Sequence, residues 1–120
     1  MHEAPSSQEL LSSVIGFLHD VAAPQLSGQA GFHARVAANA LALIGRDMAL
    51  RPEAEARERS LYAQLLQADD RDLPALRQQL CGAIQRGDFD LDDPALLAAL
   101  RAVTEAQLAI DQPGYSGLTP

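Results

Sequence analysis

Apolar residues recur along this chain at intervals of three and four positions, the spacing that places them on one side of an α-helix. No stretch alternates between apolar and polar residues over the length of a strand. The pattern predicts an all-α fold, a single-domain bundle of about five helices with no sheet. Short connections between successive helices favour antiparallel neighbours. We expect one domain over residues 1–120, with extended or flexible ends at 1–6 and 112–120.

The first predicted helix begins at Ser6 or Ser7, because Ser6-Ser7-Gln8-Glu9 is the sequence of a capping box, and it ends near Pro24. Its buried stripe is expected to contain Leu10, Leu11, Val14, Leu18 and Val21. The second helix covers residues 32–50, starting at Gln29 at the earliest. We expect Arg51-Pro52 to end this helix, since proline cannot continue the hydrogen-bond ladder.

Three further helices follow, each with its own end signals. The third is expected to start with Pro52 in its first turn and to carry the i,i+4 ion pairs Glu53–Arg57 and Glu55–Arg59. The fourth runs from Asp72 to about Arg86, and Gly87 stops it. The fifth is capped by Asp92 or Asp93 and has Pro94 in its first turn. The apolar faces of these helices contain Leu61, Leu65, Leu66, Leu73, Leu76, Leu80, Ile84, Leu96, Leu97, Leu100, Val103 and Leu108.

The segment FHARVAANALALIGRDMAL, residues 32–50, is predicted to be the most buried helix, because its large apolar residues spread over more than half of the circumference. Small residues form a second sector that lets another helix approach closely: Ala34, Ala38, Ala42, Gly45 and Ala49. Beside that sector lies a narrow polar stripe of Arg35, Asn39 and Arg46. These three side chains either pair with acids of the same bundle or form a site for an anion or a partner.

His33 falls within the apolar arc of the same helix, so we expect a core or interface histidine rather than a catalytic group. His2 and His19 are placed in the tail and on an exposed face. Cys81, the single cysteine, borders an apolar stripe and is expected to be a small buried residue. One cysteine forms no internal disulfide and fits a cytoplasmic location.

The formal net charge is −7 and the chain contains no lysine, which argues against nucleic-acid and anionic-membrane partners. The acidic run Asp88–Asp93 resembles the start of a calcium loop but lacks the required glycine and glutamate, so a helix cap explains it better. No catalytic motif, phosphate loop or metal-ligand spacing is present, and we expect neither an enzyme nor a cofactor or metal.

Four ordered blocks of the sequence carry a family resemblance. They are the N-terminal ELL and the segments FHARVAANALAL, LCGAIQRGDFDLDDPALLAALR and LAIDQPGYS. Together they resemble a family of small bacterial helical proteins long classed as a domain of unknown function. Members of that family are typically encoded beside an aminoglycoside-phosphotransferase-like kinase and an acyl-CoA dehydrogenase.

The resemblance implies a non-catalytic accessory subunit of the kinase in hydroxyacyl-CoA catabolism, with the dehydrogenase as a further partner. His33, Arg35 and Asn39 belong to the block shared with the family, and with Arg46 they are the candidate contacts for a partner or an anion. The alternative is a binding module for an acyl-CoA or another anionic metabolite. A homodimer is left open, because the apolar surface of residues 32–50 is satisfied either within one chain or between two.

Overall fold

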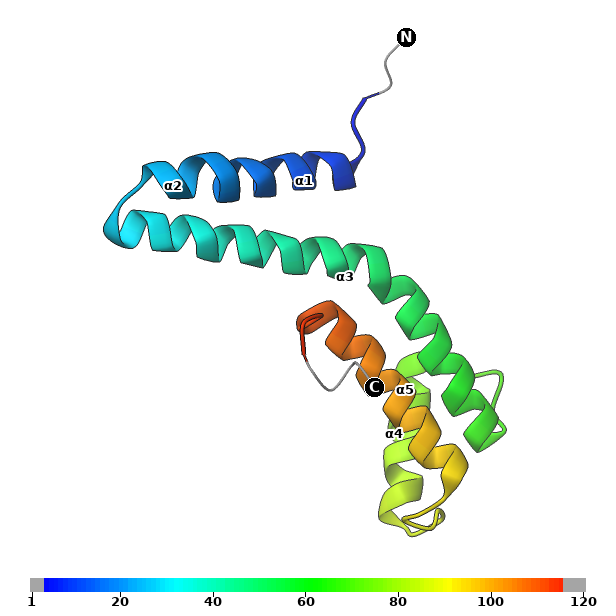
Figure 1. Ribbon diagram of the computed structural model, residues 1–120. Coiled ribbons are helices and arrows are strands. Elements are labelled where there is room, and N and C mark those ends of the chain that lie inside the picture. Colours follow the sequence, from blue (N-terminus) through cyan, green and yellow to red (C-terminus); the bar gives the residue numbers. More distant parts are fainter. Residues whose placement is uncertain (1–3, 116–120) are drawn as a thin grey trace. The chain divides into compact units, whose positions relative to one another are not determined.

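The computed structural model describes residues 4–115, which form helices joined by short loops (Figure 1). The helical segments in chain order are α1 (Ser7–Gly16), the π-helical η1 (Phe17–Ala22), α2 (Ala23–Gln25), α3 (Gly28–Leu66), α4 (Leu73–Gln85) and α5 (Pro94–Asp111). No strand occurs between residues 4 and 115, and the predicted all-α class is confirmed. Because η1 and α2 continue α1 without a break, these residues form four continuous helices rather than about five.

The difference in helix number comes from Pro52, which lies inside α3 instead of separating two helices. Proline removes one backbone hydrogen bond and crowds the preceding turn, at a cost of about 3 kcal/mol in a helix interior. The flanking residues 43–51 and 53–66 are rich in Ala, Leu, Arg and Glu, all strong helix formers, and the helix continues through the proline.

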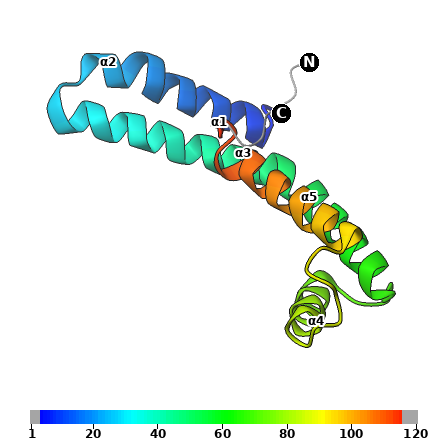
Figure 2. The same cartoon turned by 60° about the horizontal axis from the view of Figure 1, so that its bottom comes forward.

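The chain divides into two compact units, Met1–Ala49 and Leu50–Pro120, and α3 contributes to both. The prediction of one domain over residues 1–120 stays a prediction. In the first unit, α1, η1 and α2 run alongside the first half of α3, as both views show (Figure 2). In the second unit, α5 runs alongside the second half of α3 and α4 completes the group.

The start of α1 is the predicted capping box. Ser6 accepts a hydrogen bond from the Glu9 backbone N–H at 3.1 Å, and the Glu9 side chain accepts one from the Ser6 backbone N–H at 3.4 Å. The π-helical η1 follows directly and ends just before Pro24. In a regular α-helix the ring of Pro24 would clash with the carbonyl four residues earlier, and the wider π turn relieves this crowding.

The first unit is held together by small residues rather than large ones. A Cβ atom on Gly31 would lie 2.8 Å from the backbone oxygen of Leu26, and one on Gly45 would lie 2.9 Å from a methyl carbon of Leu11. Ala34 and Ala38 are buried on the same side of α3, and Ala23 is buried opposite. Two helices can approach this closely only where side chains are short, so these positions fix which face of α3 turns toward α1.

The second unit contains the hydrophobic core. The predicted cap at Asp93 is confirmed, since it accepts from the Leu96 N–H at 3.0 Å, and Asp72, the predicted start of the fourth helix, is the N-cap of α4 and accepts from the Ala75 N–H at 3.0 Å. Gly87 has φ +78 and follows α4 as the expected stop. The buried cluster of the core contains Tyr62, Ala63, Leu76, Leu80 and Leu96. Ile110, near the end of α5, is 0% exposed although the sequence pattern did not single it out.

Several burial predictions are wrong. Cys81 is exposed, and Ile84 and Leu97 reach the surface although their spacing placed them on apolar faces. Only Leu11 and Leu18 of the predicted stripe of the first helix are half-buried; Leu10, Val14 and Val21 are exposed. The common reason is that an apolar stripe is buried only where another helix covers it.

The other two histidines lie outside the helix 32–50. His2 lies outside the described residues, and His19 is exposed as predicted. No helix within residues 4–115 is long and apolar enough to cross a bilayer.

Candidate partner-binding face on α3

The pattern predicted that the segment 32–50 is the most buried helix, and this prediction is wrong. Its buried residues are the small ones that face α1, and its large apolar residues reach the surface. Five exposed side chains form a row along α3 that we call the outer stripe, and its members are Phe32, Arg35, Val36, Asn39 and Leu43. At about 100° per residue they fall within roughly one third of the helix circumference, turned away from Gly31, Ala34 and Ala38.

Phe32 is 57% exposed and makes an edge-to-face contact with His33, whose ring centroid lies 5.7 Å away at an interplanar angle of 74°. His33 is itself exposed, so it lies at the surface and not in the core. The contact restricts the rotation of both rings, which lowers the entropy lost when a partner covers them. No carboxylate of residues 4–115 forms an ion pair or a hydrogen bond with His33, so nothing there orients it as a general base.

Arg35 and Asn39 are one helical turn apart and both are exposed. Within residues 4–115 neither side chain takes part in a hydrogen bond or an ion pair. Arg46 differs from them, because it is half-buried and makes an interaction within the chain. The predicted polar stripe thus divides into two outward groups with free hydrogen-bonding capacity and one arginine that is already engaged.

The first unit is also poor in charge. Residues 4–49 contain five charged side chains, whereas residues 50–115 contain nineteen. Exposed aromatic and aliphatic residues next to arginine, with few other charges, are typical of the central part of protein interfaces. The outer stripe has this composition.

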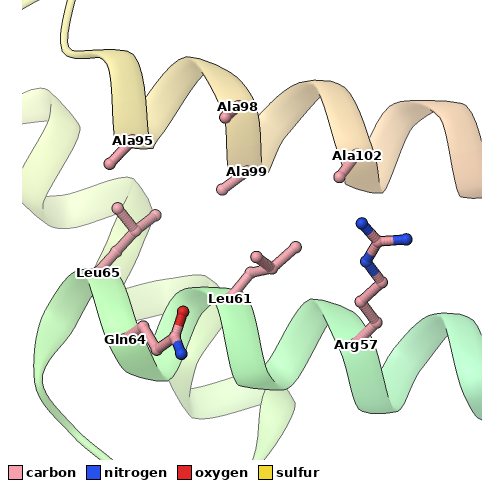
Figure 3. A pocket seen from close by; sticks show the side chains of 8 residues that line it. All are labelled: Arg57, Leu61, Gln64, Leu65, Ala95, Ala98, Ala99 and Ala102. Atoms are coloured by element: carbon pink, nitrogen blue, oxygen red, sulfur yellow. The ribbon is translucent and has the colours of Figure 1, made fainter.

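The second unit contains a groove between α3 and α5. One end of it, a cavity of ≈ 370 Å³, is lined by the side chains labelled in Figure 3: Arg57, Leu61, Gln64, Leu65, Ala95, Ala98, Ala99 and Ala102. A second cavity of ≈ 210 Å³ lies further along, and Arg57 lines both. Arg57 points toward α5 and does not pair with Glu53, so that predicted ion pair is wrong among the described residues.

Arg59 also has a different partner from the one its spacing suggests. Its Nε donates to the Arg71 backbone oxygen at 3.0 Å, and its Nη2 donates to the Asp69 backbone oxygen. The predicted pair with Glu55 does not form between residues 4 and 115. A guanidinium that holds two carbonyls of a loop stabilises the connection between α3 and α4 rather than the face of α3.

A polar cluster that the sequence did not reveal lies beside the core. Glu58 is 8% exposed and accepts hydrogen bonds from Arg77 Nε at 3.0 Å and from Nη2 at 2.7 Å. The hydrogen bond from Arg77 holds the pKa of Glu58 below its ordinary value, and burial raises the pKa of Tyr62 to about 12. Nineteen positions separate the two charged residues, so no local spacing predicts their contact.

These arrangements describe an all-helical protein whose candidate site is the exposed outer stripe of α3. Among residues 4–115, no three His, Cys, Asp or Glu side chains lie close enough together to hold a metal ion. Residues 24–115 match the family model described as Domain of unknown function (DUF6285), and the chain belongs to this family. The matched range contains the whole outer stripe. Neither the curated proteins nor the solved structures contain a match to the chain.

Proposed function

We propose that this protein is a non-catalytic accessory subunit that binds a partner protein through the outer stripe of α3. The observation that carries the proposal is the exposure of Phe32, Arg35, Val36, Asn39 and Leu43 in one row. Arg35 and Asn39 offer donors and an acceptor that the described chain leaves unused. A partner that covers the stripe would bury an aromatic ring and satisfy both polar groups, the combination that typically dominates binding energy.

The partner that we propose is an aminoglycoside-phosphotransferase-like kinase that acts on hydroxyacyl-CoA in the cytoplasm. This choice rests on the family resemblance of the blocks that contain His33, Arg35 and Asn39, and the acyl-CoA dehydrogenase is proposed as a further partner on the same ground. Arg35 is the one charged residue of the outer stripe, which favours a carboxylate on the partner surface opposite it.

The test is co-expression of the kinase with this protein, followed by gel filtration and by assay of hydroxyacyl-CoA phosphorylation. We expect a complex, and a kinase that is more active or more soluble when the small protein is present. Equal turnover with and without it, together with separate elution of the two chains, would refute the proposal.

Two matched variants locate the surface. Arg35→Glu reverses a charge inside the outer stripe and should weaken the complex by more than about tenfold, because a central interface arginine is replaced by a repelling group. Arg86→Glu makes the same charge change in the second unit, where Arg86 is exposed and pairs only with Asp88 at 3.1 Å. The complex should tolerate it. If both variants bind like the wild type, the outer stripe is not the contact.

The alternative function is a binding module for an acyl-CoA or another anionic metabolite. The groove between α3 and α5 favours it, since most of its lining is alanine and leucine and the guanidinium of Arg57 lines both cavities, with Glu53 and Gln64 as the other polar groups. Calorimetric titration with CoA thioesters tests this function directly. Heat that disappears in Arg57→Ala supports the module, and no heat together with an unchanged melting temperature removes it.

A further inference from the structure

The helix formed by α1 and η1 has two parallel rows of apolar residues. The inner row consists of Leu11, Ile15, Leu18 and Ala22, all half-buried, and Leu11 contacts the position of Gly45 on α3. The outer row consists of Leu10, Val14, Phe17 and Val21, all between 43% and 57% exposed. Along the chain each row has the 4-3-4 spacing of a seam between packed helices, and the exposed fractions show that both rows continue through the wider turns of η1.

A helix with two such rows normally packs against two neighbouring helices, as in a four-helix bundle. α3 supplies one neighbour for α1, through the inner row. The outer row has the same spacing, yet water covers it in the isolated chain. Leaving four large apolar residues in a continuous row in water is unfavourable, so this row requires a second neighbour.

An open apolar cleft, larger than an aromatic side chain, lies next to the outer row. It measures ≈ 360 Å³ and is lined by Ser7, Leu10, Leu11, Val14 and Met48, so α1 and α3 both contribute. A closed apolar cavity of ~150 Å³ is already large enough to hold benzene. Phe17, the largest side chain of the outer row, lies on the same helix three residues after Val14.

A two-fold axis relates these two features. If two α1 helices cross antiparallel near Val14, Phe17 of each copy comes level with Leu10 and Leu11 of the other. Each phenylalanine then faces the cleft of the opposite copy, so that one surface provides both the projecting group and its receptor. This reciprocity defines the interface of a symmetric dimer.

Charge does not oppose a second copy of this chain at this surface. Neither the outer row nor the lining of the cleft contains a charged residue. Two identical surfaces with a net charge repel each other when a two-fold axis brings them together, but uncharged apolar surfaces do not. The charges of α1 and η1, Glu9 and Asp20, lie outside both features.

We propose that the outer row of α1 and η1 is a homodimer interface, in which Phe17 of each copy enters the cleft of the other and the two hairpins form a four-helix bundle. The inference goes beyond the proposed function, because it uses a surface other than the outer stripe of α3. A dimer would present two outer stripes to partner molecules.

Light scattering coupled to gel filtration, over a range of protein concentrations, measures the mass of the purified full chain. We expect twice the chain mass of 12.8 kDa. Phe17→Arg should weaken the dimer by more than about tenfold, because a charge cannot enter the apolar cleft. Phe32→Arg is the matched control, since Phe32 is also 57% exposed but lies on α3 outside the cleft, and its dimer should persist. Circular dichroism checks that both variants stay helical.

Disulfide trapping gives a second measurement that does not depend on dimer affinity. In a Cys81→Ser background, Val14→Cys places a thiol at the proposed two-fold axis, where two Cα atoms come within the ~7 Å that a disulfide can span. Ser12→Cys, also exposed but on the opposite side of α1, is the control. Mild oxidation should link the first variant and not the second.

A wild-type chain that is monomeric at all concentrations overturns the proposal. Binding of a different protein to the outer row would not rescue it. Equal cross-linking of the two cysteine variants, or equal loss of dimer in Phe17→Arg and Phe32→Arg, overturns it as well. These outcomes are independent of the proposed function, because kinase binding is measured with Arg35→Glu, which leaves the outer row intact. Each proposal can therefore fail while the other stands.

Discussion

Arg77 donates two hydrogen bonds to the carboxylate of Glu58, one of 3.0 Å from Nε to Oε2 and one of 2.7 Å from Nη2 to Oε1. Glu58 lies on α3 and Arg77 on α4, so the pair ties these helices together beside the hydrophobic core. The hydroxyl of Tyr62 also lowers the pKa of the same carboxylate. An arginine that binds a carboxylate in this fork geometry gives orientation as well as energy.

We expect Glu58→Gln to lower the free energy of unfolding near pH 7 by about 1–2 kcal/mol. The amide removes the charge and turns an NH₂ group toward a donor, but half-exposed Arg77 can regain water, which limits the loss. Urea unfolding followed by circular dichroism measures the difference. Glu105→Gln, which breaks the exposed Arg101–Glu105 pair of 2.9 Å, is the control and should change stability far less.

The same pair makes stability depend on pH. Because the pKa of Glu58 is lower in the folded protein than its ordinary value of 4.5, the contribution is present above 4.5 and is lost as the pH falls through the lower folded value. The difference between wild type and Glu58→Gln should therefore shrink in acid. A difference that stays constant from pH 7 to the acid limit of the folded state would contradict this assignment.

We expect the hydroxyl of Tyr62 to lose its proton at a higher pH than that of an ordinary tyrosine. Burial is the main cause that raises its pKa to about 12 from 10.0, and the hydrogen bond to Glu58 is the second. A Tyr115→Phe variant leaves Tyr62 as the sole tyrosine, so an ultraviolet titration reports its phenolate alone. Since the folded pKa is the higher one, this stabilisation is complete below pH 10 and disappears as the pH rises through 12. A midpoint at 10 would show that the hydroxyl is not buried.

The end of α3 offers a stabilising substitution. Gln67 has φ 54, in the left-handed region, and the Ala68 N–H donates to the Ala63 oxygen at 3.0 Å to close the helix. Gln67→Gly removes a backbone strain of roughly 1 kcal/mol from the folded state. Part of this gain in stability is lost, because glycine has more conformational freedom in the unfolded chain. We expect a small rise in melting temperature. Gln64→Gly, one turn earlier inside the helix, should lower it.

The ends of helices were predictable because their signals are local. Ser6 with Glu9, Asp72 with Ala75 and Gly87 each act within a few residues, and all three are found where the sequence placed them. The prediction that Pro52 ends a helix was wrong, because the free-energy cost of one proline is small beside the stabilisation of the long helix around it. A local rule gives the cost of the proline but not the stabilisation that the flanking residues contribute.

Burial was predicted less well than helix position. Periodicity tells which residues share a face but not whether a neighbour covers it, so Phe32 and Ile44 were expected inside and lie at the surface. The candidate site shows the same difference. Arg35, Asn39 and Arg46 share one side of α3 as expected, yet only the structure distinguishes the two outward side chains from the engaged Arg46. The Glu58–Arg77 pair joins two helices, and no single-sequence rule anticipates it.

Gly31 should be the glycine of the first unit that tolerates a side chain least. A Cβ there would lie 2.8 Å from the Leu26 backbone oxygen and 3.4 Å from that of Ala23, and neither backbone atom can move without opening the hairpin. Gly16 is the matched control, because it is helical and nothing lies within 4 Å of its Cβ position. Gly16→Ala should raise stability by about 0.5–1 kcal/mol through the better helix propensity of alanine. Gly31→Ala should lower it despite the same gain, and thermal unfolding of the two variants compares them. If Gly31→Ala were as stable as Gly16→Ala, the close approach that turns the outer stripe of α3 away from α1 would be absent in solution.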